Sequence, residues 1–141
     1  NGETALFASA TSGFSRACEV LLNHGAKTEV AESVHGSTPL IAAARHGHDV
    51  ICLLLLKAKA DTEATNKNGE TALFASATSG FSRACEVLLN HGAKTEVAES
   101  VHGSTPLIAA ARHGHDVICL LLLKAKADTE ATNKNGETAL F

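Results

Sequence analysis

Histidine is the residue type in this sequence best suited to binding a metal ion or to exchanging protons near neutral pH. The chain has eight histidines in 141 residues, and half of them are His24, His35, His46 and His48. His46 and His48 flank Gly47, where a bend between two short helices is expected, so a structural role is the simpler interpretation. We therefore expect no metal site and no cofactor, and we keep pH-sensitive contacts of the imidazoles as the alternative.

Four cysteines could supply a nucleophile, a disulfide or metal ligands. Cys18, Cys52, Cys85 and Cys119 lie 34, 33 and 34 residues apart. Each falls within an apolar helical pattern and none has a partner at metal-ligand spacing, so we interpret them as small buried side chains. Unpaired buried thiols favour a reducing compartment such as the cytoplasm. An extracellular filament is also compatible with them, and the localisation stays open.

No other pattern indicates catalysis. The sequence contains no Ser-His-Asp arrangement, no glycine-rich phosphate loop and no paired-carboxylate motif, and Arg16 with Glu19 is typical of an exposed helix pair. A net charge of −3 does not fit the basic surface that nucleic-acid binding requires. The longest apolar run, Val50 to Leu56, is far shorter than the roughly 20 residues that span a bilayer. We expect no enzymatic activity, no nucleic-acid binding and no membrane insertion.

The elements that position these residues follow from an internal repeat. Residues 1–67 recur without change as residues 68–134, and a third copy begins at residue 135. Within each unit there is a weaker similarity, in which Thr4-Ala5-Leu6 matches Thr38-Pro39-Leu40. This similarity divides the unit into two related repeats. The sequence therefore predicts repeats at residues 1–34, 35–67, 68–101 and 102–134, and the start of a further repeat at residues 135–141, whose helix would begin at Leu140-Phe141.

Each repeat has the pattern of two short helices. Thr38 is a suitable N-cap and Pro39 takes the first helical position, where a missing N–H costs nothing, so the first helix should run to Gly47. A second helix with a leucine-rich apolar face should begin near His48 or Asp49 and end around Ala58. A polar return segment with an Asn-Gly turn then leads to the next repeat.

One segment of the second repeat resembles the ankyrin repeat. It is Thr38-Pro39-Leu40-Ile41-Ala42-Ala43-Ala44, followed by Gly47-His48, a leucine-rich helix and Ala60-Asp61. The likeness extends over essentially the whole chain. It implies an all-α, ankyrin-type solenoid of helix pairs with projecting hairpin loops, and this stretch contains no capping repeat with a polar outer face.

Two departures from the ankyrin pattern have structural consequences. The signature histidine is replaced by Phe7 and Ile41, so apolar packing should replace the polar link between neighbouring repeats. The glycine after the second helix is kept as Gly25 but becomes Lys59 in the other repeat. A lysine in this left-handed position should be strained by about 1 kcal/mol relative to glycine.

The resemblance implies that the chain binds a protein partner through its loop tips and the inner face of the first helices. The residues at matching positions are Val34, His35, Ser37, Arg45, His46, Lys67, Asn68, Glu70, Thr78 and Ser79. An ordinary solvated face is the alternative interpretation of these positions. The predicted function is a non-catalytic scaffold for protein-protein interaction. We expect the chain to be part of a longer array, because it begins at Asn1 and contains no methionine.

A structural, self-assembling filament is the second hypothesis. Val50 and Leu53 occupy positions that are usually polar in the family, their copies are Val117 and Leu120, and a spacing of three residues places each pair on one helix face. Exposed apolar patches usually mark contacts, so these residues predict lateral self-association. A slightly rotated helix that buries them is the alternative. Identical repeats that stack end to end would lengthen such a filament.

Overall fold

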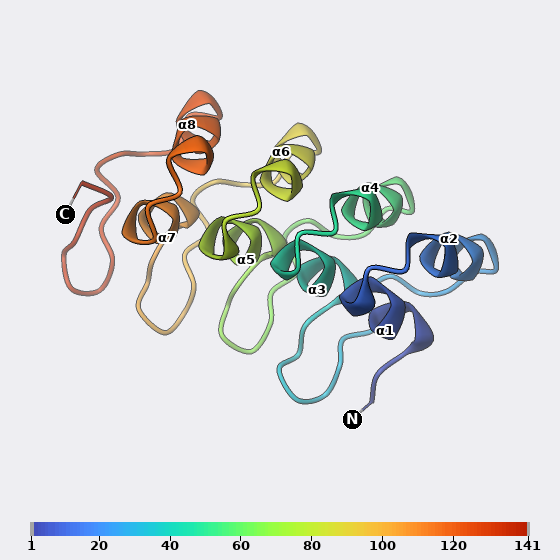
Figure 1. Ribbon diagram of the computed structural model, residues 1–141. Coiled ribbons are helices and arrows are strands. Elements are labelled where there is room, and N and C mark those ends of the chain that lie inside the picture. The colour runs from blue at the N-terminus through green and yellow to red at the C-terminus, as the bar shows by residue number, and fades with distance from the viewer. Residues whose placement is uncertain (1, 141) are drawn as a thin grey trace.

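The computed structural model describes residues 2–140, and over this range the regular secondary structure is entirely helical. The described helices, shown in Figure 1, are α1 (Ala5–Ser12), α2 (Ser15–Asn23), α3 (Pro39–Arg45), α4 (Asp49–Lys57), α5 (Ala72–Ser79), α6 (Ser82–Asn90), α7 (Pro106–Arg112) and α8 (Asp116–Lys124).

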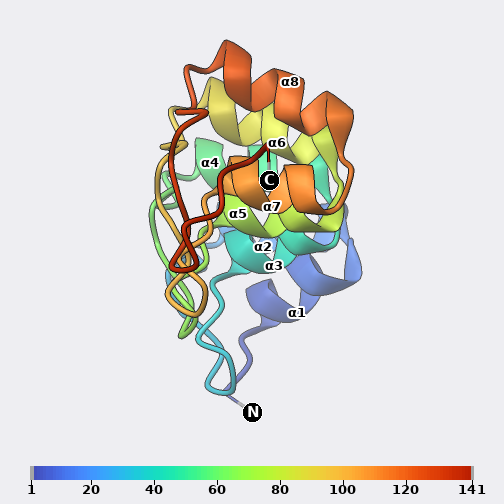
Figure 2. The same ribbon diagram turned by 90° about the vertical axis from the view of Figure 1, so that its left-hand side faces the viewer.

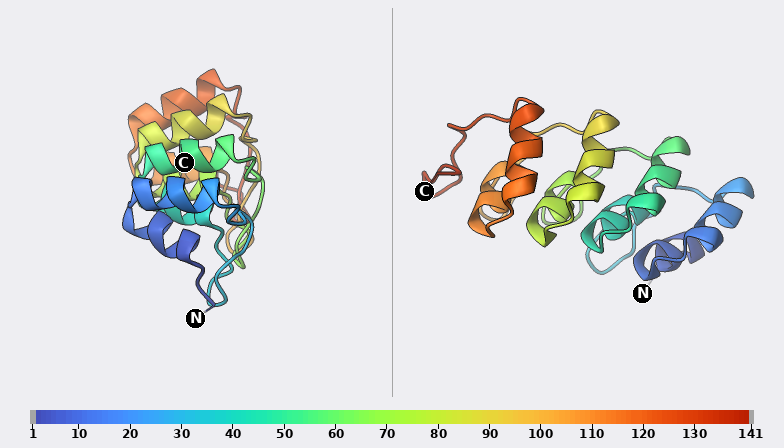
Figure 3. Two further views of the ribbon diagram at one scale, coloured as in Figure 1. Left: turned by 90° about the vertical axis from the view of Figure 1, so that its right-hand side faces the viewer. Right: turned by 45° about the horizontal axis from the view of Figure 1, so that its top comes forward.

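The helices form two rows that run the length of the molecule. The odd-numbered helices lie side by side in one row and the even-numbered helices in the other, with each helix in contact with its counterpart in the next repeat. The connections between repeats project as long loops past the odd row, all on the same side (Figure 2). Figure 3 shows the helix pairs stacked in chain order. The predicted all-α solenoid is confirmed.

A threonine begins every first helix. Its side-chain oxygen accepts a hydrogen bond from the backbone N–H three residues later, at 3.1 to 3.3 Å, and this occurs at Thr4, Thr38, Thr71 and Thr105. Such a cap satisfies one of the N–H groups that a helix start leaves without a partner. The predicted start of a helix at Pro39 is confirmed.

A left-handed residue lies two positions after the end of each second helix. Gly25 takes a φ of 83° there, and the equivalent Lys59 takes a φ of 67° in the other repeat type. The lysine copy Lys126 repeats this conformation with a φ of 70°. The expectation that a lysine occupies a left-handed position is therefore confirmed, and the strain is present twice in the chain.

The core is formed by stacking rather than within single repeats. Ala43 and Leu55 of the second repeat are completely buried, and Phe7 and Ile41 are buried at the position where the ankyrin signature has histidine. Leu56 is 7% exposed, whereas its copy Leu123 in the last helix pair is 41% exposed. The residue types around these two leucines are the same, so the neighbouring repeat accounts for the difference in burial.

A ring from the next repeat covers the bend between the two helices of the preceding repeat. The pairs are His48 on Gly13, Phe81 on Gly47 and His115 on Gly80. A Cβ atom placed on Gly47 would lie 2.4 Å from Cδ1 of Phe81, closer than two carbon atoms can approach, and the φ of Gly47 is 75°. Glycine is therefore required here both for its backbone conformation and for the close approach of the ring.

The further repeat predicted at residues 135–141 does not begin a helix within the described part of the chain. Residues 139 and 140 form a turn. A helical turn needs more residues than the described chain has here, so the further repeat stays a prediction, and Phe141 lies outside the described residues.

Candidate partner-binding groove

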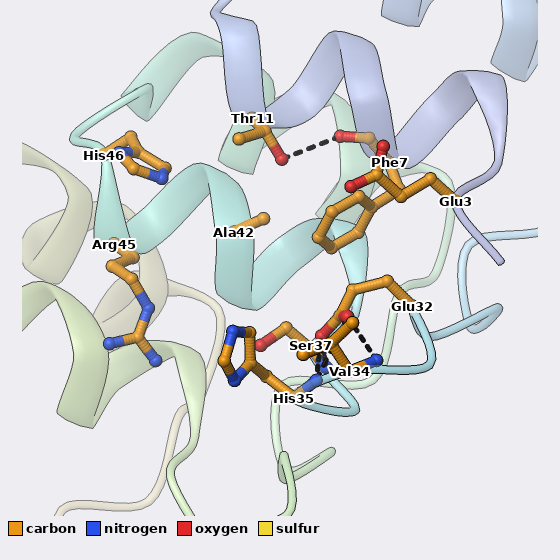
Figure 4. A pocket seen from close by; sticks show the side chains of 10 residues that line it. All are labelled: Glu3, Phe7, Thr11, Glu32, Val34, His35, Ser37, Ala42, Arg45 and His46. Carbon is orange, nitrogen blue, oxygen red and sulfur yellow. Dashed lines mark hydrogen bonds between the residues drawn. The ribbon is translucent and has the colours of Figure 1, made fainter. Parts of the chain in front are cut away.

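Two pockets lie where the odd-numbered helices meet the projecting loops. The first pocket has a volume of about 330 Å³ (Figure 4), and the second has a volume of about 470 Å³. The first is lined by Glu3, Phe7, Thr11, Glu32, Val34, His35, Ser37, Ala42, Arg45 and His46. The same ten residue types line the second pocket 67 positions later, together with Asn68. We call the face that holds both pockets the groove.

Most of the predicted partner-binding residues line one of these pockets. The first pocket contains Val34, His35, Ser37, Arg45 and His46, and the second contains Asn68, Glu70 and Thr78. Lys67 and Ser79 line neither pocket, although both are exposed. The structure therefore brings five of the predicted residues together in the first pocket and three in the second.

The buried carboxylate of Glu32 organises the loop that carries Val34 and His35. Its oxygens accept backbone N–H groups of Val34 at 2.7 Å, His35 at 2.8 and 3.0 Å, and Ser37 at 3.0 Å. Glu99 makes the corresponding bonds in the second unit. Such charge-assisted bonds are stronger than bonds between neutral groups, so the loop tip has one defined shape.

Asn66 organises the other type of loop in the same way. Its Oδ1 accepts the N–H of Asn68 at 2.9 Å and the N–H of Glu70 at 3.0 Å, and its Nδ2 donates to Glu70 Oε2 at 2.6 Å. Glu32 and Asn66 were not identified from the sequence. The two residues occupy equivalent positions in the two repeats, each just before a glycine-containing turn. This shared position could have indicated that both side chains stabilise the turn.

The same hydrogen bonds keep these carboxyl groups ionised. The N–H of Ser37 is the largest influence on Glu32 and lowers the pKa of that carboxyl below its ordinary value of 4.5, against the opposing effect of desolvation. For Glu99 desolvation is the largest influence and raises the pKa, but the bonds from Ser104, His102 and Val101 together outweigh it, and the pKa is lowered as well.

An ion pair crosses the groove between neighbouring repeats. Arg45 Nη2 at the end of α3 lies 2.5 Å from Glu70 Oε2 in the next loop. The copy, Arg112 with Glu137, has a distance of 2.9 Å. Exposed pairs of this kind contribute at most about 1 kcal/mol, so the main effect of Glu70 is to hold one edge of the guanidinium in place.

The projecting loops are also bonded to one another. The N–H of Lys67 donates to His35 O at 2.9 Å, and Lys67 Nζ donates to Ser33 O at 2.6 Å and to Val34 O at 3.0 Å. The predicted partner-binding lysine is therefore engaged in joining two loops. This contact fixes the loop tips relative to each other.

Two histidines meet where α3 turns into α4. The ring centroids of His46 and His48 are 6.2 Å apart. Nε2 of His48 lies 3.2 Å from Thr11 O of the preceding repeat, whereas His46 is exposed and lines the first pocket. The predicted structural role fits His48, and His46 is left facing the groove.

The residues predicted for lateral contact lie on the even-numbered helices, away from the groove. Val50 is 57% exposed, Val117 is 62% exposed and Leu120 is 55% exposed. Leu53 is only partly exposed. A valine is thus presented once per unit, and of the two leucines only Leu120 is well exposed.

The cysteine thiols are free, and they lie apart from the groove pockets. Burial raises the pKa of Cys52 to about 12 and that of Cys85 to about 11. Cys18, Cys52 and Cys85 are buried as predicted, but Cys119 is partly exposed because no helix pair follows α8 in the described range. Among residues 2–140 no group of three or more His, Cys, Asp or Glu is placed to hold a metal ion.

No helix in the described part of the chain is long and apolar enough to cross a bilayer.

Comparison with known proteins identifies a family but no individual relative among curated proteins. A family model described as ankyrin repeats (three copies) matches residues 1–66 and 51–135. The two matches overlap and together cover nearly the whole chain. No curated protein matches this sequence.

Replacing both Glu32 and Glu99 by glutamine should make the stability of the fold less sensitive to acid. The folded-state pKa of each carboxyl is lowered, so its ionised form stabilises the protein fully above about pH 5, and this stabilisation is lost as the pH falls through the folded-state pKa. Circular dichroism melts between about pH 7 and pH 3 should show a lower Tm for the double variant at pH 7 and a shallower fall in Tm below pH 5.

The matched control changes Glu19 and Glu86 to glutamine, because both are exposed on second helices. This control should keep the wild-type dependence of Tm on pH. An equally steep fall in Tm for wild type and for the Glu32→Gln/Glu99→Gln variant would contradict the role given to the two loop carboxylates.

Proposed function

The chain belongs to the ankyrin-repeat family, and from that premise we propose that it is a non-catalytic scaffold whose groove binds a protein partner. Repeats of this family generally mediate protein-protein interaction. The observation that carries the proposal is the recurrence of one pocket, with the same lining residue types, once in each 67-residue unit. Recognition over two such pockets requires a partner that is long compared with a small molecule.

The groove is ordered before a partner arrives. The loop tips are fixed by Glu32 and by Lys67, and the guanidinium of Arg45 is held by Glu70. Binding to fixed loops costs less conformational entropy than binding to loops that must first be ordered. The exposed Val34 and His46 then provide accessible apolar and polar contacts at the surface.

The carboxylates of Glu32 and Glu70 are engaged in holding the groove in shape. Both oxygens of Glu32 are occupied by backbone N–H groups, and Oε2 of Glu70 holds Arg45 and Asn66. A general base needs a free lone pair within hydrogen-bond reach of a substrate proton. These carboxylates are instead used to shape the surface.

Adding a negative charge at both loop tips should abolish partner capture. We would immobilise the 141-residue chain and its Val34→Glu/Val101→Glu variant, expose both to an extract of the source cells, and identify cross-linked proteins by mass spectrometry. Both valines are 55% exposed, so the fold should be retained. A partner bound in the groove should be cross-linked to the wild-type chain at groove residues and lost from the variant.

The control for this experiment is Arg16→Glu/Arg83→Glu, which places two glutamates at exposed positions of the second helices and makes the net charge more negative than the loop variant does. It should capture the same partner as the wild type. If the loop variant still captures the partner, or if the control loses it equally, the groove is not the binding face.

A filament is the second candidate function. In this candidate identical repeats stack end to end, and the stacks associate laterally through the even-numbered helices. The exposure of Val50, Val117 and Leu120 on one side of the molecule supports it, because a row of exposed apolar side chains usually marks a contact.

Sedimentation velocity over a concentration series tests the lateral contact. Val50→Glu/Val117→Glu/Leu120→Glu should remove association that the wild type shows at high concentration, because burying the introduced carboxylates would cost free energy. Leu53 is left unchanged because it is partly covered. A monomeric wild type, or association that is identical in the variant, would rule out lateral contact through these side chains.

A further inference from the structure

The two pockets of the groove differ in position but have ten lining residue types in common. We propose that the groove binds one extended polypeptide segment that carries the same anchor twice, about six residues apart, each anchor being an apolar side chain next to a carboxylate. This inference rests on the proposed function of the groove and specifies the chemistry and spacing of its partner.

The apolar part of the anchor is indicated by one side of each pocket. In Figure 4 the ring of Phe7 points into the first pocket toward Ala42, and Val34 approaches from the loop. Phe7 and Ala42 are buried, whereas Val34 is exposed. A leucine-sized side chain placed beside the Phe7 ring would bury its own apolar surface and part of that of Val34, which stabilises a complex.

The acidic part of the anchor is indicated by the opposite side of the same pocket. His35, Arg45 and His46 lie across from the Phe7 ring (Figure 4). A guanidinium has five N–H donors in a planar fork, and the hydrogen bond from Arg45 to Glu70 is made by Nη2 alone. The side chain of Arg45 is 38% exposed, so donors are left for a carboxylate of the partner.

Competing acidic groups in the pockets are mostly occupied. Glu32 and Glu99 are saturated by backbone N–H groups, and Glu70, on the edge of the second pocket, is bound to Arg45 and Asn66. Glu3 is exposed at the edge of the first pocket. The side formed by the arginine and the imidazoles is therefore the part of each pocket that has hydrogen-bond donors to offer to an anion.

The spacing of the anchors follows from the stacking of the helices. Packed helices lie about 8–10 Å apart, so the pockets, which are two repeats apart, are separated by roughly 16–20 Å. An extended chain advances about 3.3 Å per residue, which gives five or six residues between anchors. Side chains of a strand alternate between two faces, so only an even spacing directs both anchors into the groove, and six residues fit.

Fluorescence anisotropy with two synthetic peptides tests this spacing. Both peptides have the same composition, with two Leu-Glu pairs among serine and threonine residues and a fluorescein label. The leucines are six residues apart in one peptide and three apart in the other. The six-residue peptide should bind at least about tenfold more tightly, because it alone can engage both pockets at once. Equal affinities, or no binding of the six-residue peptide, would overturn the proposal.

Arg45→Ala tests the acidic half of the anchor. It should lower the affinity for the six-residue peptide to that for the three-residue peptide, because one of the two pockets loses its guanidinium. Arg16→Ala, exposed on α2, should leave both affinities unchanged. Melting curves confirm that both variants fold. Unchanged affinity in Arg45→Ala, or the same loss in Arg16→Ala, would overturn the proposal.

The peptide experiment and the capture experiment can fail separately. If a partner is captured through the groove but the six-residue peptide has no advantage, the periodic acidic ligand is overturned while the scaffold function stands. If groove-dependent capture and peptide binding are both missing, both proposals are overturned.

Discussion

Contact between neighbouring repeats is the interaction on which the rest of this structure depends. Each helix pair is too small to bury its own apolar face, so stability comes from stacking. The two identical units show this within one molecule. Ala72 and Ala84 of the third repeat are buried, whereas their copies Ala5 and Ala17 in the first helix pair are exposed. Identical residues thus differ in burial according to the neighbours that the stack provides.

The groove is a product of the same stacking. Its walls come from more than one repeat, and the bonds that shape it cross repeat boundaries: Arg45 reaches Glu70 in the next loop, and Lys67 reaches back to the carbonyl of Val34. A single repeat would contain the residues of a pocket without their relative positions. The 67-residue period of the sequence therefore becomes a spatial period of pockets, and this is the basis of both the scaffold function and the two-anchor ligand that we propose.

The fold could be predicted from the sequence because local signals and the period agree. A threonine cap before Pro39 and the leucine-rich second helix follow from short-range rules, and the left-handed position of Lys59 follows from the resemblance to the ankyrin pattern. The contacts that shape the groove were predicted less completely. The role of Glu32 depends on the way its loop folds back over the carboxylate, and the contact of Phe81 with Gly47 depends on how closely adjacent repeats approach. Residue type and spacing alone encode neither the path of the Glu32 loop nor the separation of adjacent repeats.

A matched pair of glycine substitutions tests the stacking account most directly. Gly47 and Gly114 are copies with φ values of 75° and 72°, but Phe81 covers Gly47 and nothing lies within 4 Å of the Cβ position of Gly114. Both alanine variants incur the backbone strain of about 1 kcal/mol. Gly47→Ala must also displace the ring, so urea unfolding should show a larger loss of stability for Gly47→Ala than for Gly114→Ala. Equal losses would contradict the account, because burial by the next repeat would then have no energetic effect at this bend.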